Sequence, residues 1–232
     1  EEKVIGGGET TAAGQPLFSP DGRWLAFIES GEEWQNLILV DLQTSERHIL
    51  LPGDGFDLMS PAWVQGTRSL GWSPDSQSLY SIRNAGGVST LWRVGLDGRA
   101  DMLDLGPYRA LSQLAVSSQG KLALLASGMV TPTRLIVIED GKIRVAARSD
   151  SEVIPEEFLP VPRALDWRAA DGALVHGIYY PPSNPDFSAE GLPPAILNIH
   201  GGPTSAVSLR YNADASYFTS RGYAYLEVNY RG

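Results

Sequence analysis

A turn motif recurs along the chain, and this repeat constrains the fold more than any other feature. Phe18-Ser-Pro-Asp-Gly-Arg-Trp-Leu-Ala-Phe27 returns as Trp72-Ser-Pro-Asp-Ser-Gln-Ser-Leu-Tyr-Ser81, and a weaker third copy is Val116-Ser-Ser-Gln-Gly-Lys-Leu-Ala-Leu-Leu125. In the two clear copies, proline sets φ for a tight reversal between an apolar residue and a strand-like run. The turns start 54 and 44 residues apart. A period of about 40–50 residues with several strands per unit is typical of a β-propeller blade.

Each copy is followed by a second apolar run, at residues 36–42, 90–96 and 134–140. Asp97-Gly98 and Asp140-Gly141 then provide hairpin turns. The 25 Gly and 16 Pro residues of the 232-residue chain agree with many short strands joined by turns. Residues 1–150 are therefore expected to form about three blades, with Pro61-Ala-Trp63 leading into or beginning the second. Because propellers usually have about four to eight blades, further blades are expected from outside this chain.

The pattern changes near residue 150. Residues 151–157 form a charged connector that contains proline. The runs 163–168 and 174–180 flank an Asp-Gly turn and predict an antiparallel hairpin. A buried run at 195–199, a helix at about 212–221 and a strand at 223–229 follow. Strand, helix and strand in this order predict parallel pairing in an α/β region that covers residues 151–232.

The buried run at 195–199 ends in His200-Gly201-Gly202-Pro203. A strand that ends in His-Gly-Gly resembles the oxyanion-hole turn of α/β-hydrolases, in which a main-chain N–H binds the developing negative charge. Glycine suits such a turn because the backbone must approach the substrate carbonyl closely. Taken alone, the tetrapeptide is equally compatible with an ordinary turn between a strand and a loop.

Arg221-Gly-Tyr223 and Asn229-Tyr-Arg-Gly232 make the pattern more specific. With the turn at 19–22, Asp171-Gly172 and Pro181, they resemble the prolyl oligopeptidase family of serine peptidases, particularly its acylaminoacyl-peptidase and dipeptidyl-aminopeptidase-like members. The resemblance implies a mixed fold: a partial β-propeller over residues 1–150, followed by the N-terminal part of an α/β-hydrolase domain over residues 151–232. It also implies that the Gly202 N–H contributes to the oxyanion hole, Gly201 provides the turn geometry and His200 shapes the turn.

No Gly-x-Ser-x-Gly nucleophile motif occurs in the 232 residues. The resemblance places the catalytic Ser, Asp and His, in that order, beyond Gly232. The chain is thus expected to be part of a longer enzyme and inactive alone, and His48 and His176 are expected to be structural. The predicted reaction is hydrolysis of aminoacyl or acyl-peptide bonds in short peptides through an acyl-enzyme. The alternatives are an esterase of the same fold and a non-catalytic propeller that binds a partner.

Composition narrows the range of partners. Eighteen basic and 27 acidic residues give a net charge of −9, which argues against binding to nucleic acid or an anionic membrane. The absence of cysteine excludes disulfides and thiolate chemistry, and the three histidines have no neighbours at metal-ligand spacing. Neither a cofactor nor a metal is expected. The expected partners are short peptides and the remaining segments of the same enzyme, and the oligomeric state stays open. Without a signal-peptide pattern or an apolar run of ~18 residues, a cytoplasmic location is expected.

Overall fold

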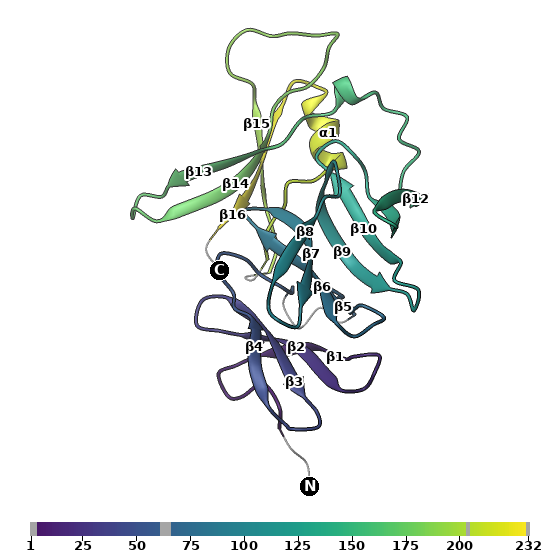
Figure 1. The fold of residues 1–232 in the computed structure, drawn as a ribbon. Coiled ribbons are helices and arrows are strands. Elements are labelled where there is room, and N and C mark those ends of the chain that lie inside the picture. Colours follow the sequence, from purple (N-terminus) through teal and green to yellow (C-terminus); the bar gives the residue numbers. More distant parts are fainter. Residues whose placement is uncertain (1–3, 61–65, 203–204, 231–232) are drawn as a thin grey trace.

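The computed structural model describes residues 4–60, 66–202 and 205–230, and within these ranges the strands form four sheets of four strands each. The predicted segment Pro61-Ala-Trp63 lies outside them, as do Pro203, Arg231 and Gly232 of the two C-terminal motifs. Three of the sheets are antiparallel meanders that follow one another along the chain (Figure 1). They confirm the prediction of about three propeller blades. In the described ranges these sheets do not close into a ring.

The first blade consists of β1 (Ala13–Phe18), β2 (Trp24–Ser30), β3 (Gln35–Asp41) and β4 (Arg47–Leu51). The second consists of β5 (Leu70–Trp72), β6 (Ser78–Ala85), β7 (Val88–Gly95) and β8 (Ala100–Leu103). The third consists of β9 (Tyr108–Val116), β10 (Leu122–Gly128), β11 (Arg134–Glu139) and β12 (Lys142–Arg148). The repeated turn joins the first two strands of every blade.

This turn has the same backbone in all three blades. Its fourth residue has positive φ in each case: 73° at Gly22, 60° at Ser76 and 80° at Gly120. The N–H of that residue donates to the carbonyl of the first serine at 2.9–3.0 Å. In the first two copies the serine hydroxyl also donates to the aspartate two residues on, at 2.5 and 2.6 Å, and this bond is the main cause that lowers the pKa of Asp21 and Asp75. The third copy has Gln119 in place of the aspartate.

Neighbouring blades pack face to face through alternate residues of their strands. Ala26, Ile28, Leu37 and Leu39 of the first blade contact Leu70, Trp72, Leu79 and Val94 of the second. Ile82 and Leu91, on the opposite face of the second blade, pack against the third, chiefly against Leu114, Leu122, Leu124 and Ile136. The innermost strand β5 contacts both β1 and β9. These inter-blade cores place the first strands of all three blades next to one another.

The fourth sheet has the order β13-β14-β16-β15 and is mixed. Its strands are β13 (Arg163–Arg168), β14 (Leu174–Tyr180), β15 (Ala195–Ile199) and β16 (Ala224–Asn229), and the short 3₁₀ helix η1 (Glu156–Phe158) precedes them. β13 and β14 form the predicted antiparallel hairpin, which extends away from the blades in Figure 1. β15 and β16 pair in parallel, as predicted. The division of the chain into two domains at residue 150 stays a prediction.

Helix α1 (Ala213–Thr219) connects β15 to β16. It starts at Asn212, whose side-chain oxygen accepts a hydrogen bond from the Ala215 N–H at 3.0 Å, as N-cap residues commonly do. It ends before Gly222, which has φ 88°. The helix packs on the sheet through Ala215 and Phe218, against Ile178, Tyr180 and Tyr225. Within the described ranges, no helix has the length and apolar character needed to cross a membrane.

Candidate active site

The His200–Gly202 turn leaves the fourth sheet at the end of β15. Gly202 has φ 70°, a conformation that favours glycine, and so the turn geometry depends on this residue. A Cβ added at Gly201 or Gly202 would meet no described atom within 4 Å. The space beside the two glycines is therefore free of described protein atoms. Neither glycine N–H has a hydrogen-bond acceptor among the described residues.

The last residue of β16, Asn229, and the residue after it, Tyr230, hold the segment that contains this turn. The Tyr230 ring stacks on the His200 ring with centroids 4.4 Å apart, and its hydroxyl donates to the carbonyl oxygens of Gly202 at 2.8 Å and His200 at 3.1 Å. Asn229 binds the backbone further along: its Oδ1 accepts from the Val207 N–H at 2.8 Å. The Asn-Tyr part of the C-terminal motif thus contacts both sides of the turn, a role that the sequence analysis did not assign.

The sheet register explains why these residues meet. Ile199 pairs with Val228 in the parallel ladder, so His200 and Tyr230 follow the carboxyl ends of adjacent strands. In α/β sheets, ligands bind outside this edge. The sequence predicts the parallel pairing of 195–199 with 223–229. That pairing places the residue after the second run beside the His-Gly-Gly turn, and so it could have identified Tyr230.

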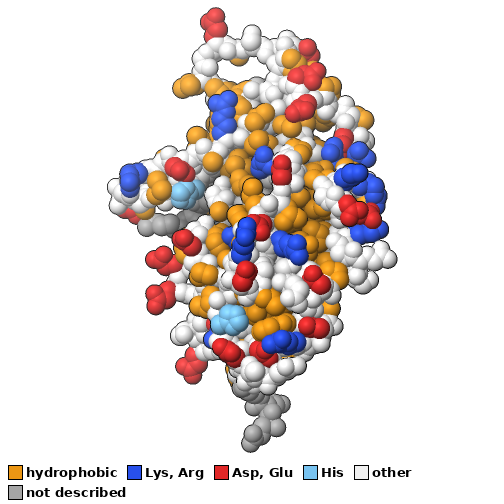
Figure 2. Space-filling view, in the orientation of Figure 1, with side chains coloured by type: hydrophobic (Ala, Val, Ile, Leu, Met, Phe, Trp, Pro, Cys, Tyr) orange, Lys and Arg blue, Asp and Glu red, His pale blue; other side chains and the backbone are white. Residues whose placement is uncertain are grey.

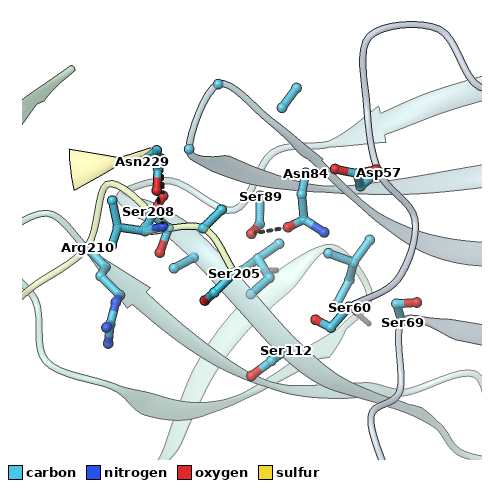
Figure 3. A pocket seen from close by; sticks show the side chains of 18 of the residues that line it. Asp57, Ser60, Ser69, Asn84, Ser89, Ser112, Ser205, Ser208, Arg210 and Asn229 are labelled. Carbon is cyan, nitrogen blue, oxygen red and sulfur yellow. Dashed lines mark hydrogen bonds between the residues drawn. The ribbon is translucent and has the colours of Figure 1, made fainter. Parts of the chain in front are cut away.

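Both glycines lie in the wall of a cavity of about 1360 Å³ between the blades and the fourth sheet. Figure 3 shows Asn229, Ser205 and Ser208 on one side, Asn84 and Ser89 in the middle, and Asp57, Ser60 and Ser69 on the other side. Gln15, Ser69 and Gln113 also line it, from the innermost part of each blade. The cavity therefore brings the turn and all three blades to one space, whose propeller wall is rich in hydroxyl and amide groups.

Asp57 supplies a carboxylate to this wall. Its backbone forms two hydrogen bonds with that of Asn84, at 2.9 and 2.8 Å, which hold it beside the second blade. The Asn84 side chain in turn accepts a hydrogen bond from the Ser89 hydroxyl at 2.7 Å. Partial burial raises the pKa of Asp57.

Over the outer face shown in Figure 2, acidic and basic side chains are mixed, with hydrophobic patches between them.

His176, for which the sequence predicts a structural role, lies beside an acidic side chain. His176 Nδ1 lies 2.6 Å from Asp166 Oδ1 across the β13–β14 hairpin, and both residues line the cavity. The Asp171-Gly172 turn places residues 166 and 176 opposite each other, so the pair could have been inferred from the sequence. The structure places His48 in β4. In the described part of the chain no group of three His, Cys, Asp or Glu residues could hold a metal ion.

Comparisons with known proteins bear on this arrangement. No protein-family profile matches the chain. Dipeptidyl-peptidase 5 of Porphyromonas gingivalis is 24% identical over 230 residues, which are 94% of this chain and 31% of that protein. The structure of a puromycin-hydrolyzing peptidase of Mycobacterium tuberculosis superposes with a TM-score of 0.88 at 26% identity, and the match covers 98% of this chain and 35% of that one.

A prolyl endopeptidase structure shares the fold with a TM-score of 0.58 at 16% identity, over 95% of this chain and 38% of that one. The chain spans about a third of the length of these relatives. The blades, the mixed sheet and the similarity to peptidases along nearly the whole chain agree with the motifs at 200–203 and 229–232. Along nearly its whole length the chain is thus similar to peptidases, and it shares its fold with a prolyl endopeptidase.

Proposed function

We propose that this chain is part of a serine peptidase that cleaves aminoacyl or acyl-peptide bonds of short peptides through an acyl-enzyme. In this proposal residues 1–150 provide propeller blades that wall the cavity, and residues 151–232 begin the hydrolase domain. The catalytic Ser, Asp and His come from segments outside residues 1–232. The named relatives, a dipeptidyl-peptidase and a puromycin-hydrolyzing peptidase, support peptide-like substrates.

The observation that carries the proposal is the Gly202 main-chain N–H. It has no acceptor among the described residues, its residue has φ 70°, and its turn faces the cavity. A preorganised N–H of this kind can bind the oxyanion of a tetrahedral intermediate without reorganising during the reaction. Gly201 completes the turn. His200 shapes it by its stacking on Tyr230, and the ring atom His200 Nε2 is buried with no hydrogen-bond partner in the described ranges.

The test compares Gly202→Ala with Gly201→Ala in the complete protein as its gene encodes it. The first substitution forces a side chain into positive φ and displaces the donor, whereas Gly201 has open space and no positive φ. Removing one oxyanion donor lowers kcat by about 100-fold or more, so G202A should lose that much and G201A much less. Peptide nitroanilides with free and acylated N-termini, and nitrophenyl esters, serve as substrates. Unchanged kcat in G202A contradicts the assigned role, and turnover of esters alone favours the esterase.

The isolated chain of residues 1–232 provides the second arm of the test. The proposal expects it to hydrolyse none of these substrates and to resist labelling by a serine-directed phosphonate. The complete protein should hydrolyse these substrates and be labelled by the phosphonate. Turnover by the isolated chain would show that its catalytic residues lie within these 232 positions.

A further inference from the structure

Tyr230 makes three contacts with one short segment. Its ring is nearly parallel to the His200 imidazole, with an interplanar angle of 17°. Its hydroxyl donates to the carbonyl oxygens on either side of Gly201, those of His200 and Gly202. A phenol has one hydrogen, so the two carbonyls share it in a three-centre bond. This one side chain therefore contacts the turn at both of its ends.

These contacts restrict where the N–H groups of the turn point. In a planar trans peptide the N–H is directed opposite to the carbonyl oxygen of the same peptide unit. The His200 carbonyl points toward Tyr230, so the Gly201 N–H points away from it. The Gly201 carbonyl lies 3.4 Å from His200 Nδ1, so the Gly202 N–H points away from the imidazole that Tyr230 stacks on. Tyr230 thus fixes the Gly201 N–H directly, and it constrains the Gly202 N–H indirectly, by stacking on the imidazole and by holding the peptide units on both sides of the Gly201–Gly202 unit.

The position of Tyr230 is itself well determined by its neighbours. It directly follows β16, which hydrogen-bonds to β14 on one side and β15 on the other. The preceding residue, Asn229, is held by its bond with Val207. Tyr230 is half-buried, and it reaches the turn from the strand next to the one that the turn follows.

We propose that Tyr230 is a positioning residue for the reaction: through its hydroxyl it holds the carbonyls of His200 and Gly202, which belong to the two peptide units flanking the Gly201–Gly202 unit, and by fixing both flanks it directs the Gly202 N–H of that unit into the cavity. This inference rests on the proposed function, because it assigns Tyr230 a role at the same oxyanion donor. Tyr230 does not touch the reacting atoms and acts only through the turn. Its effect should therefore appear in kcat, since an oxyanion donor stabilises the transition state more than the bound substrate.

The test uses Tyr230→Phe and Tyr230→Leu in the complete protein, with Tyr223→Phe as the matched control. Phe keeps the ring that stacks on His200 and removes only the hydroxyl, and Leu removes both. Tyr223 packs its ring against Phe218, and its hydroxyl has no hydrogen bond in the described ranges. Serine-directed phosphonate labelling counts the active sites, so that kcat is expressed per competent molecule. Unfolding midpoints of all variants report any general loss of structure.

We expect Y230F to lower kcat about 10-fold with KM changed by less than twofold, because the Gly202 N–H, which acts mainly in the transition state, is then held less firmly in place. Y230L should lose more, and Y223F should match the wild type. A peptide aldehyde, which mimics the tetrahedral intermediate, should bind Y230F more weakly by the same factor as kcat/KM falls. A purely structural role would lower the labelled fraction and the unfolding midpoint without this loss of aldehyde affinity.

Wild-type kcat per labelled site in Y230F would overturn the inference while leaving the proposed function intact. So would a loss that appears only in KM. If the wild-type complete protein neither hydrolyses the substrates nor reacts with the phosphonate, the proposed function fails and the inference fails with it.

Discussion

The Ser69 main-chain N–H, at the inner edge of the second blade, donates to the side-chain Oε1 of Gln15 in the first blade over 2.7 Å. The Ser69 hydroxyl shares the same acceptor at 3.2 Å. Both residues stand four positions before the serine of their own repeated turn, as does Gln113 in the third blade. Gln15 and Gln113 also share positive φ, at 55° and 58°. A side chain of one repeat thus satisfies the backbone of the next.

Replacing Gln15 by Ala should destabilise the protein. The buried Ser69 N–H would lose its acceptor, which costs about 1–3 kcal/mol. Gln113→Ala is the matched control, because Gln113 has the same backbone conformation and is exposed, with no side-chain hydrogen bond in the described ranges. Urea unfolding followed by tryptophan fluorescence gives both values. Equal losses at the two positions would show that the Gln15–Ser69 bond adds nothing.

Ser76 tests how much the strained backbone of the second turn costs the protein. It adopts φ 60° where the other two turns have glycine, and its buried hydroxyl accepts from the Asp21 N–H of the first turn at 3.1 Å. Ser76→Ala loses the bond and keeps the strain, whereas Ser76→Gly loses the bond and relieves the strain. Positive φ costs a non-glycine residue about 1–2 kcal/mol, so the Gly variant should be more stable than the Ala variant by that amount. Thermal unfolding of the two variants measures this difference in stability. An Ala variant as stable as the Gly variant would show that the positive φ at position 76 costs nothing.

Tyr180 should make the protein sensitive to alkali. Its fully buried hydroxyl donates to Glu227 Oε2 and to the Arg210 carbonyl, each at 3.1 Å. Burial, followed by the Glu227 charge, raises the pKa of Tyr180 above its ordinary value of 10.0. The folded protein therefore keeps a proton that the unfolded chain releases, so this contribution to stability is complete below about pH 10 and falls above it.

Tyr180→Phe should destabilise the protein by about 1–3 kcal/mol at pH 7, because the buried Glu227 carboxylate loses a donor. Its stability should then decline less steeply than that of the wild type above pH 10. Tyr223→Phe controls for tyrosine content, since Tyr223 is exposed and its hydroxyl has no hydrogen bond in the described ranges. Urea midpoints from pH 7 to 11 test this, and parallel curves for wild type and Y180F would exclude the effect.

Glu152 should give the connector after the third blade a dependence on acid. Its carboxylate accepts two hydrogen bonds from Arg134, at 2.7 and 2.5 Å, and one from Arg148 at 3.1 Å. The bonds from Arg134 are the main cause that lowers the pKa of Glu152, against an opposing effect of burial. The stability that this pairing provides is present above the ordinary pKa of 4.5 and is lost as the pH falls through the lower, folded-state value.

Glu152→Gln should cost about 1 kcal/mol or less at pH 7, because the ion pairs are near the surface. Between pH 5 and 2 the variant should lose less stability than the wild type. Glu139→Gln, which removes one exposed ion pair with Lys121, serves as the control. Chemical denaturation across this pH range is the measurement. An E152Q variant that declines as steeply as the wild type would assign the acid sensitivity to other groups.

Local patterns predicted much of the fold. The repeated Ser-Pro-Asp turn identified three blades because a tight turn between two apolar runs requires only neighbouring residues. The first strands β1, β5 and β9 were not predicted individually, and neither were the outer strands β4, β8 and β12. The residues of the outer strands are largely exposed and lack the apolar pattern of the inner strands, and so the sequence marks them weakly. The helix prediction was two residues too long at its C-terminal end, because Ser220 and Arg221 belong to the turn before Gly222.

The sequence by itself determined the periodic turns, the parallel strand–helix–strand unit and the identity of the His-Gly-Gly turn, since each depends on the conformational preferences of a few adjacent residues. Only the tertiary structure decided that Tyr230 stacks on His200, that Gln15 bonds to Ser69, and that the glycine turn and three blades surround one cavity. These contacts join residues that lie 30 or more positions apart. They arise from sheet register and from packing between blades, which a local pattern does not record.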